Sequence, residues 1–296
     1  MNFCLGTVQF GMDYGIQGNV QPELKNIYDM LDYAVEHEIT HFDTASAYGM
    51  AENVLGGYIR EYPGSAERMN IISKLKPEAF LNSSRNDWPG IALENARKSM
   101  ECLGIKKFSS YLFHNASFIF DEDAVTALYS VVEHGLADRI GVSVYTPEEA
   151  LKALDYSQIG TIQIPYNVFD RRLDKFDFFK RASEMGITVY ARSSLLQGLA
   201  VMDPEKLPDR VAFAKEYLLK YEAICSEFSL SKLDAAIGYV VQKTGIDYVV
   251  FGVDNLKQLE EYTKMKNITV PDEFIHRIDK LFDSVPDKLV NPSLWK

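Results

Sequence analysis

The stretch Ile39-Thr40-His41-Phe42-Asp43-Thr44 is a short run of mainly β-branched and aromatic residues between two helix-like stretches. Runs of this length and composition are typical of buried strands. Pro22–Glu38 precedes it, with apolar residues at helical spacing and Pro22 at the expected first helical position. Ala51–Arg60 follows it and is again helix-like. The order is therefore helix, strand, helix, with the carboxylate of Asp43 near the end of the strand.

The same alternation is expected along the whole chain. Eight runs are predicted as strands: Phe3–Phe10, Ile39–Thr44, Met69–Leu75, Phe108–His114, Arg139–Val144, Thr161–Tyr166, Ile187–Arg192 and Asp247–Val253. Helices are predicted over Pro22–Glu38, Ala51–Arg60, Ile91–Leu103, Ala124–His134, Pro147–Leu154, Phe176–Met185, Asn255–Lys264, Asp272–Phe282 and, as two helices or a broken one, Tyr217–Lys243.

Eight strands that alternate with helices predict a parallel sheet. A length of 296 residues suits closure of that sheet into a (β/α)8 TIM barrel, a single domain over residues 1–296. A doubly wound open sheet is the alternative, because it also alternates strands and helices. It is disfavoured because no Gly-x-Gly-x-x-Gly follows a predicted strand, and the sequence has no Walker phosphate loop.

The composition is that of an ordinary globular protein, with 47% apolar and 25% charged residues. A net charge of −11 and the absence of basic runs make the chain a poor candidate for nucleic-acid binding. No stretch approaches the roughly 20 apolar residues that cross a bilayer, and residues 1–10 lack signal-peptide features. Three widely spaced cysteines predict neither disulfides nor a zinc cluster. We expect a cytoplasmic protein that binds neither nucleic acid nor membrane.

Polar and ionisable residues follow almost every predicted strand. In a barrel of this type, the carboxyl ends of the strands form one rim, and the chemistry is carried there. The residues expected on this rim are Gly6, Thr7, Gln9, Asp43, Tyr48, Lys74, His114, Ser143, Gln163, Asn167, Arg192, Ser193, Gly252 and Asp254.

Four of these residues, Asp43, Tyr48, Lys74 and His114, make chemical sense as a proton-transfer site. A phenol is a weak acid with a pKa near 10, and a lysine cation beside it is expected to lower that pKa. A carboxylate would hold the lysine, and a histidine would donate a second hydrogen bond to a substrate oxygen. Because no activated nucleophile is present, acyl transfer is not expected. Reduction of a carbonyl fits, with the hydride supplied by a cofactor.

The sequence His37-Glu38-Ile39-Thr40-His41 matches the zinc-protease pattern His-Glu-x-x-His. That pattern needs both histidines on one helical face. Here the helix is predicted to end near His37, and His41 lies in the following strand. We therefore expect no metal site.

Several segments resemble the aldo-keto reductase superfamily. They are Phe42-Asp43-Thr44-Ala45-Ser46-Ala47-Tyr48-Gly49, Ser73-Lys74, Tyr111-Leu112-Phe113-His114-Asn115, Arg139-Ile140-Gly141-Val142-Ser143, Gln163-Ile164-Pro165-Tyr166-Asn167, Ser193–Leu199 and Gly252–Glu261. The matches occur in order from Leu5 to about Glu261. The resemblance implies a (β/α)8 barrel that binds NADP or NAD without a Rossmann fold.

The resemblance also implies roles for individual residues. Tyr48 would be the general acid, Lys74 its electrostatic activator, Asp43 the partner of Lys74, and His114 the donor that orients the substrate. Ser143 and Gln163 would hold the nicotinamide carboxamide. The residues implied to bind the cofactor are Gly6, Thr7, Asp43, Ser143, Gln163, Arg192, Ser193, Leu195, Gln197, Gly198, Gly252, Asp254, Gln258 and Glu261.

Three positions depart from the family pattern. Val144 stands where the family usually has Asn, and Arg192 stands where an aromatic residue usually stacks on the nicotinamide. A guanidinium can stack as well, or bind an anion, and Tyr190 on the same strand face is a partial substitute. Asp254 stands where a basic or small residue often accepts the 2′-phosphate, and a carboxylate at this position favours NAD. The usual nucleotide of the family is NADP, and Lys257 nearby also favours NADP. The choice between the two nucleotides stays open.

The substrate is expected to be a small carbonyl compound or sugar. The loops expected around it are 82–88, 115–120, 197–210 and the tail 284–296, and Arg171 and Arg192 raise the option of an anionic substrate. Two other functions stay open: a redox-sensing regulator that binds cofactor with little turnover, and a sugar dehydratase or epimerase that retains its cofactor. A monomer or a small homo-oligomer is expected.

Overall fold

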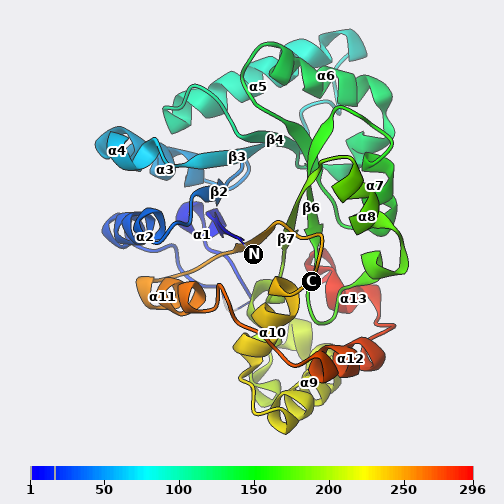
Figure 1. Ribbon diagram of the computed structural model, residues 1–296. Coiled ribbons are helices and arrows are strands. Elements are labelled where there is room, and N and C mark those ends of the chain that lie inside the picture. Colours follow the sequence, from blue (N-terminus) through cyan, green and yellow to red (C-terminus); the bar gives the residue numbers. More distant parts are fainter. Residues whose placement is uncertain (1, 17, 296) are drawn as a thin grey trace.

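The computed structural model describes residues 2–16 and 18–295, and its centre is a closed barrel of eight parallel strands in chain order (Figure 1). The strands are β1 (Asn2–Gly6), β2 (His41–Asp43), β3 (Asn70–Leu75), β4 (Ser110–Phe113), β5 (Ile140–Ser143), β6 (Ile159–Pro165), β7 (Thr188–Arg192) and β8 (Tyr248–Phe251). The barrel closes where β1 pairs with β8, with Cys4 opposite Val250. The predicted (β/α)8 barrel is confirmed, and the open sheet is excluded.

Helices surround the strands (Figure 1). They are α2 (Leu24–Glu36), α3 (Ala51–Glu61), α5 (Trp88–Leu103), α6 (Glu122–Glu133), α7 (Pro147–Ala153), α8 (Phe178–Glu184), α9 (Lys215–Glu227), α10 (Lys232–Val241), α11 (Leu256–Lys264) and α12 (Asp272–Leu281), with the short α1 (Val8–Gly11), α4 (Pro63–Ala66) and α13 (Asp287–Val290). Of the two possibilities for residues 217–243, two helices are confirmed. They separate at Ser229, whose φ is 55°, and the Ser231 side chain caps α10 by accepting from the amide of Asp234.

Several predicted boundaries are wrong; for example, α5 begins at Trp88 rather than at Ile91. The first strand ends at Gly6 rather than Phe10, because the amide of Phe10 donates to the carbonyl of Thr7 at 2.9 Å and the chain turns into α1. Pro22 is not the first residue of its helix. The helix α2 begins at Leu24, with Glu23 as an extended N-cap. The hydrophobic pattern of the sequence predicts that these elements exist more reliably than it predicts the residues at which they begin and end.

The barrel interior is filled by a small apolar cluster that the larger outer core surrounds. The inner cluster consists of Cys4, Ile72, Leu112, Tyr190 and Val250. At the amino-terminal mouth, the rings of Tyr190 and Tyr248 stack at 4.6 Å. A cavity of about 350 Å³ lies beside these two rings, and a cavity of about 830 Å³ lies at the opposite, carboxyl-terminal mouth.

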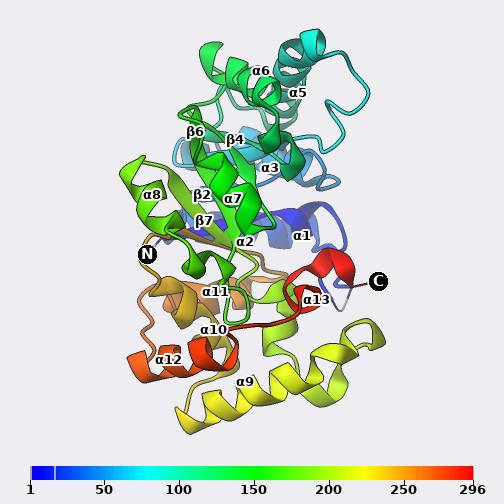
Figure 2. The same ribbon diagram turned by 90° about the vertical axis from the view of Figure 1, so that its right-hand side faces the viewer.

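Part of the segment 287–295 lies at that carboxyl-terminal mouth, where Pro292 and Ser293 line the cavity. Figure 2 shows α13 on the same side of the barrel as α1, which follows directly after β1. Leu289 and Val290 of α13 are buried, and Trp295 donates to the carbonyl of Lys288 at 2.6 Å. In the part of the chain that the structure describes, no helix has the length and apolar character needed to cross a membrane.

A close backbone contact holds the turn that carries Tyr48 against α1. The amide of Met50 donates to the carbonyl of Gly11 at 3.0 Å. A Cβ atom at Gly11 would lie 1.9 Å from the Tyr48 carbonyl oxygen and 2.3 Å from the Ala51 nitrogen. Only glycine fits there without moving the backbone, so Gly11 helps to set the position of Tyr48.

Replacement of Gly11 by Ala is therefore expected to destabilise the protein. Overpacking of this kind typically costs about 1–3 kcal/mol, and we expect about 3 kcal/mol because both clashing atoms belong to the backbone. Urea unfolding measures the change in the free energy of unfolding. The matched control is Gly90→Ala in α5, where a Cβ meets nothing within 4 Å and where Ala is expected to be neutral or to stabilise by up to about 1 kcal/mol. Equal stabilities for the two variants would contradict this account of Gly11.

Candidate functional site

A cavity of about 830 Å³ opens at the carboxyl ends of the strands. Fifteen of the residues predicted for the site line it: Gly6, Thr7, Asp43, Tyr48, His114, Ser143, Arg192, Ser193, Leu195, Gln197, Gly198, Gly252, Asp254, Gln258 and Glu261. The two others, Lys74 and Gln163, are buried and reach the cavity through Asp43. The structure thus brings all of the predicted site residues into one region.

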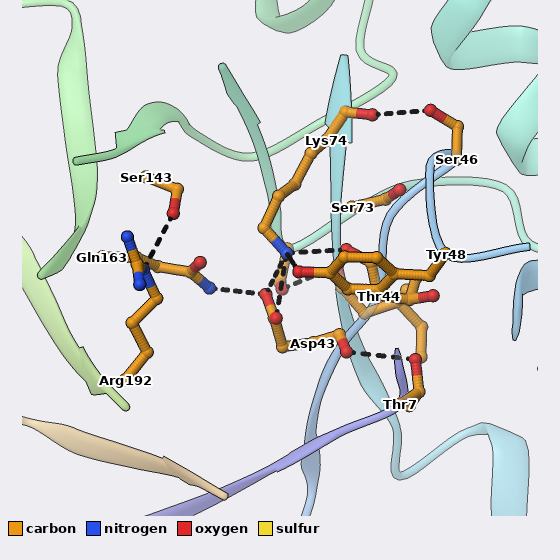
Figure 3. A network of polar contacts seen from close by, with 12 residues as sticks. Thr7, Asp43, Thr44, Ser46, Tyr48, Ser73, Lys74, Ser143, Gln163 and Arg192 are labelled. Atoms are coloured by element: carbon orange, nitrogen blue, oxygen red, sulfur yellow. Dashed lines mark hydrogen bonds and ion pairs between the residues drawn. The ribbon is translucent and has the colours of Figure 1, made fainter. Parts of the chain in front are cut away.

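Lys74 lies at the centre of a polar network that joins β2, β3 and the turn after β2 (Figure 3). Its Nζ atom donates to the two carboxylate oxygens of Asp43 at 2.8 and 2.9 Å. It also donates to the carbonyl of Thr44 at 2.9 Å and to the hydroxyl of Tyr48 at 3.4 Å. The Lys74 side chain is 1% exposed and that of Asp43 is 8% exposed. The cation is therefore held directly beneath the phenol.

Burial and charge act in opposite directions on this pair. Burial alone would lower the pKa of Lys74, but the nearby Asp43 carboxylate and Tyr48 oxygen outweigh it, and the pKa is raised. Burial raises the pKa of Tyr48, and Lys74 offsets only part of that rise. The expectation that Lys74 lowers the phenol's pKa is thus right for the contribution of Lys74 and wrong for the net shift, because burial is the larger cause. Tyr48 therefore keeps its proton near neutral pH.

His114 packs against Tyr48 at the end of β4. The two rings meet edge to face, with centroids 5.6 Å apart. Burial, and secondarily the cations of Lys74 and Arg192, lower the pKa of His114 to about 3. The imidazole is therefore neutral at physiological pH. Its Nδ1 atom is buried and has no hydrogen-bond partner among the described residues.

Gln163 and Ser143 are each tied to a charged neighbour. The Gln163 side-chain amide donates to Asp43 Oδ1, and its Oε1 atom is buried without a partner in the described chain. Ser143 Oγ accepts a hydrogen bond from Arg192 Nε at 3.2 Å. Both side chains are thus held in fixed orientations next to the network of Lys74.

Arg192 closes the side of the cavity formed by β5 and β7. It donates to the carbonyl of Val144 at 2.6 Å and to Ser193 Oγ at 3.2 Å. Its guanidinium carbon lies 4.4 Å from the centroid of the Tyr145 ring. The suggestion that Tyr190 shares this position is wrong, because Tyr190 lies at the other mouth of the barrel and its hydroxyl contacts His41 at 2.9 Å.

The segment after β7 has an unusual backbone. Ser193, Leu196 and Gln197 have φ values of 60°, 49° and 56°, and Gly198 has a φ of 94°. L-residues with side chains adopt this region at some cost, and such residues cluster at binding sites. Turns that combine right- and left-handed residues also direct amide groups into a concavity that suits anions. This segment lines the cavity between Arg192 and the far end.

The end of the cavity formed by Asp254 and Glu261, away from Arg192, is acidic. Asp254 Oδ2 accepts from the Asn19 side chain at 2.6 Å, and the Asp254 amide donates to Gln258 Oε1 at 2.8 Å. Its other carboxylate oxygen is buried and has no partner in the described ranges. Glu261 of α11 also lines this end.

Sequence reasoning missed one wall of the cavity, the loop after α1. Tyr14, Gly15, Ile16 and Asn19 line the cavity from that loop. Tyr14 accepts a hydrogen bond from the Gln197 side chain at 3.3 Å. In the sequence, the glycines at 15 and 18 indicate a turn in this loop, and in the structure both have a positive φ.

The expected substrate loops divide into two groups. Val201, Met202 and Asp203 line the cavity, as do Pro292 and Ser293 of the tail. No residue of 82–88 or 115–120 lines it. Both loops instead pack against Phe80, whose ring stacks on Trp88 and lies 5.2 Å from the ring of Phe118. Arg171 is also directed elsewhere and pairs with Asp279 at 3.3 Å.

Buried polar atoms without partners gather at this cavity. Among the lining residues of the described chain they are His114 Nδ1, Asp254 Oδ1, Gln9 Oε1 and Ser194 Oγ. Gln163 Oε1 lies behind them, on the side chain that donates to Asp43. Such atoms normally find partners, so the lining suits a large polar ligand such as a dinucleotide. Within residues 2–16 and 18–295, no group of three or more His, Cys, Asp or Glu side chains could hold a metal. His37 lies at the end of α2 and His41 in β2, so the His-Glu-x-x-His match lacks the helix that it requires.

Comparison with known proteins places the chain in one protein family. Residues 2–283 match the model of the Aldo/keto reductase family. The chain is similar to the uncharacterized oxidoreductase YrpG of Bacillus subtilis (strain 168), with 23% identity over 94% of this chain and 91% of the relative. It is also similar to the L-glyceraldehyde 3-phosphate reductase of Escherichia coli (strain K12), with 22% identity over 85% and 82%. The crystal structure of PA4992 from Pseudomonas aeruginosa shares the fold, with a TM-score of 0.66, 22% identity and coverage of 89% and 88%.

The low pKa of His114 predicts a specific acid sensitivity. In the unfolded chain the imidazole binds a proton below about pH 6.5, whereas in the folded protein it does so only below about 3. The contribution of His114 to stability is therefore complete above about pH 6.5 and is lost as the pH falls towards 3, by up to about 1.4 kcal/mol per pH unit.

We expect His114→Asn to make the decline in the free energy of unfolding between pH 6.5 and 4 shallower. Urea unfolding at a series of pH values measures this slope. His276→Asn, at an exposed histidine of α12, is the control and should leave the slope unchanged. A wild-type slope retained in His114→Asn would contradict the prediction.

Proposed function

This chain belongs to the aldo/keto reductase family, and we propose that it reduces an aldehyde, ketone or keto-sugar to an alcohol with a reduced nicotinamide dinucleotide. The observation that carries the proposal is the buried Asp43–Lys74–Tyr48 network, with His114 against it, on the wall of a cavity of about 830 Å³. The nucleotide supplies the hydride that the side chains cannot supply. The family assignment makes the chain an oxidoreductase, and the residue roles below are our proposal.

In the proposed reaction the chain's own residues handle the proton. Tyr48 gives its hydroxyl proton to the carbonyl oxygen as the carbonyl carbon accepts the hydride. The Lys74 cation, 3.4 Å from that hydroxyl, stabilises the phenolate that remains, and Asp43 keeps Lys74 in place. Because His114 is neutral, one ring nitrogen carries a hydrogen that can orient the carbonyl oxygen. The phenol then regains its proton from solvent.

The remaining lining residues would hold the dinucleotide. Ser143 and Gln163 are the proposed partners of the carboxamide, together with Gly6, Thr7 and Asp43 near the reaction centre. The segment after β7, in which Ser193, Gln197 and Gly198 are left-handed and Leu195 also lines the cavity, suits the pyrophosphate. Gly252, Asp254, Gln258 and Glu261 would surround the adenosine.

We infer that the nucleotide is NADH rather than NADPH. A 2′-phosphate at the far end would meet the carboxylates of Asp254 and Glu261. Among the lining residues of the described chain, Arg192 is the one Lys or Arg, and it lies at the reaction centre with Ser143. Lys257 is exposed and does not line the cavity. A carboxylate accepts a hydrogen bond from a free ribose hydroxyl but repels a phosphate.

The substrate would enter between Val201–Asp203 and the tail, residues 284–296, which we propose to be part of the single barrel domain. The lining of this part mixes apolar Val201 and Met202 with polar Asp203 and Ser293, which suits a small carbonyl compound or sugar. The name of the Escherichia coli relative, L-glyceraldehyde 3-phosphate reductase, makes a phosphorylated aldehyde a useful member of the first test panel.

Tyr48→Phe tests the proposed reaction. We expect kcat to fall by about 100-fold or more, the usual size of a lost general acid, with nucleotide affinity unchanged. The measurement is oxidation of NADH and NADPH with a panel of aldehydes, ketones and keto-sugars, and titration of each nucleotide. Tyr156→Phe, which lies outside the cavity, is the control. Turnover retained by Tyr48→Phe would refute its role, and tight nucleotide binding without any turnover would favour a regulator or an enzyme that retains its cofactor.

Removal of the acidic side chains tests the choice of nucleotide. We expect the wild type to bind NADH more tightly than NADPH, and Asp254→Ser combined with Glu261→Gln to reduce the preference by about tenfold, which is about 1.4 kcal/mol. Fluorescence titration measures both dissociation constants. Glu260→Gln, in the same helix but outside the cavity, is the control. Tighter binding of NADPH by the wild type would refute the inference.

A further inference from the structure

Arg192 is an uncompensated cation beside the reaction centre. Among the described residues it forms no ion pair, and its donors go to the neutral atoms Ser143 Oγ, Ser193 Oγ and Val144 O. Lys74, by contrast, contacts both oxygens of Asp43. The paired charges of Lys74 and Asp43 cancel, so Arg192 leaves this end of the cavity with one net positive charge.

The position of the guanidinium is fixed from several sides. Three hydrogen bonds at 2.6–3.2 Å join it to Ser143, to Ser193 and to the Val144 carbonyl. The Tyr145 ring lies 4.4 Å from its carbon, a distance at which an aromatic face attracts a cation. Figure 3 shows Arg192 directed towards Ser143. Arg192 therefore cannot move its charge away without breaking these contacts.

The field of this charge reaches the groups that would surround a reacting carbonyl. Arg192 contributes to the lowered pKa of His114, after burial and Lys74. It also acts on Tyr14, whose pKa burial raises and Arg192 partly lowers. Any ligand ring held between Tyr48, His114 and Ser143 lies within the same field.

We propose that Arg192 discriminates between the two redox states of the nicotinamide, so that the protein binds the reduced nucleotide more tightly than the oxidised one. This inference rests on the proposed function. In the proposed reaction a bound dihydronicotinamide would supply a hydride, with its electron pair, to the carbonyl carbon, and Tyr48 would give the proton to the oxygen. The nicotinamide ring would thereby change from neutral to singly positive. A fixed cation nearby raises the free energy of the positive ring and leaves the neutral ring nearly unaffected.

Two consequences follow for the direction of the reaction. The oxidised nucleotide is bound less tightly than the reduced one, so its release after turnover is favoured. The reduced nucleotide competes well for the site even where the oxidised form is in excess. Arg192 is thus a specificity-determining residue for the redox state, and Tyr145 is a positioning residue that acts through it.

The experiment is a titration of wild type, Arg192→Gln and Arg192→Lys with NADH and NAD⁺, and with NADPH and NADP⁺. The ring charge is the same in both pairs, so the result does not depend on the preference set by Asp254. We expect the ratio of the dissociation constants, oxidised over reduced, to fall by about tenfold in Arg192→Gln. Arg192→Lys retains the positive charge, so its ratio of dissociation constants should stay close to that of the wild type.

The control is Arg277→Gln, which removes one positive charge from the exposed pair of Arg277 with Glu227 and should leave the ratio unchanged. A ratio in Arg192→Gln equal to that of the wild type overturns the proposal. An equal fall in Arg192→Lys and Arg192→Gln also overturns it, because shape rather than charge would then be responsible. If the wild type binds no nucleotide in either state, the proposed function fails as well, which is a different result from binding both states equally.

Discussion

The buried ion pair of Lys74 and Asp43 is the interaction on which the rest of the site depends. Charges removed from water are costly unless nearly all of their donors and acceptors find partners. Here Asp43 receives both contacts from Lys74 and a further hydrogen bond from Gln163. Lys74 directs its other contacts to Thr44 and Tyr48. Asp43 and Lys74 lie on the neighbouring strands β2 and β3, whereas Gln163 reaches Asp43 from β6, on another part of the barrel wall. The complete network therefore requires the barrel and not only the pairing of two strands.

The sequence predicts the rim of the barrel well because parallel strands impose a simple rule. Each strand is buried on both faces, so it reads as an apolar run, and the residue after the run must lie on the common rim. The position of a side chain along the barrel axis is harder to predict from the sequence. Tyr190 and Arg192 share a face of β7, but a strand rises about 3.3 Å per residue, and this step takes Tyr190 to the opposite mouth. Tyr14 and Asn19 could not be predicted, because their loop is shaped by contacts with Gln197 and Asp254, far away in the chain.

Charge varies along the cavity in a way that no single motif reveals. One end holds the fixed cation of Arg192, and the other holds Asp254 and Glu261. Between them lies a segment whose backbone, rather than side-chain charge, suits an anion. A ligand complementary to this pattern has a neutral ring at the first end, a central anionic group, and hydrogen-bond donors without added negative charge at the second. A dinucleotide with a reduced nicotinamide and a free 2′-hydroxyl has this distribution of charge.

The two halves of the site differ in how they are held. Asp43, Lys74, Gln163 and Ser143 lie on strands, are buried, and are held by hydrogen bonds. This arrangement suits a reaction in which dipoles and charges must be in place before the transition state forms. The segment from Ser193 to Gly198 instead lies in a loop with left-handed residues, and its neighbour, the loop after α1, is joined to it by the contact of Gln197 with Tyr14. Residues in such conformations persist only where surrounding contacts maintain them. Binding and release of a ligand would therefore involve these two loops, whereas the network of Lys74 has no need to move.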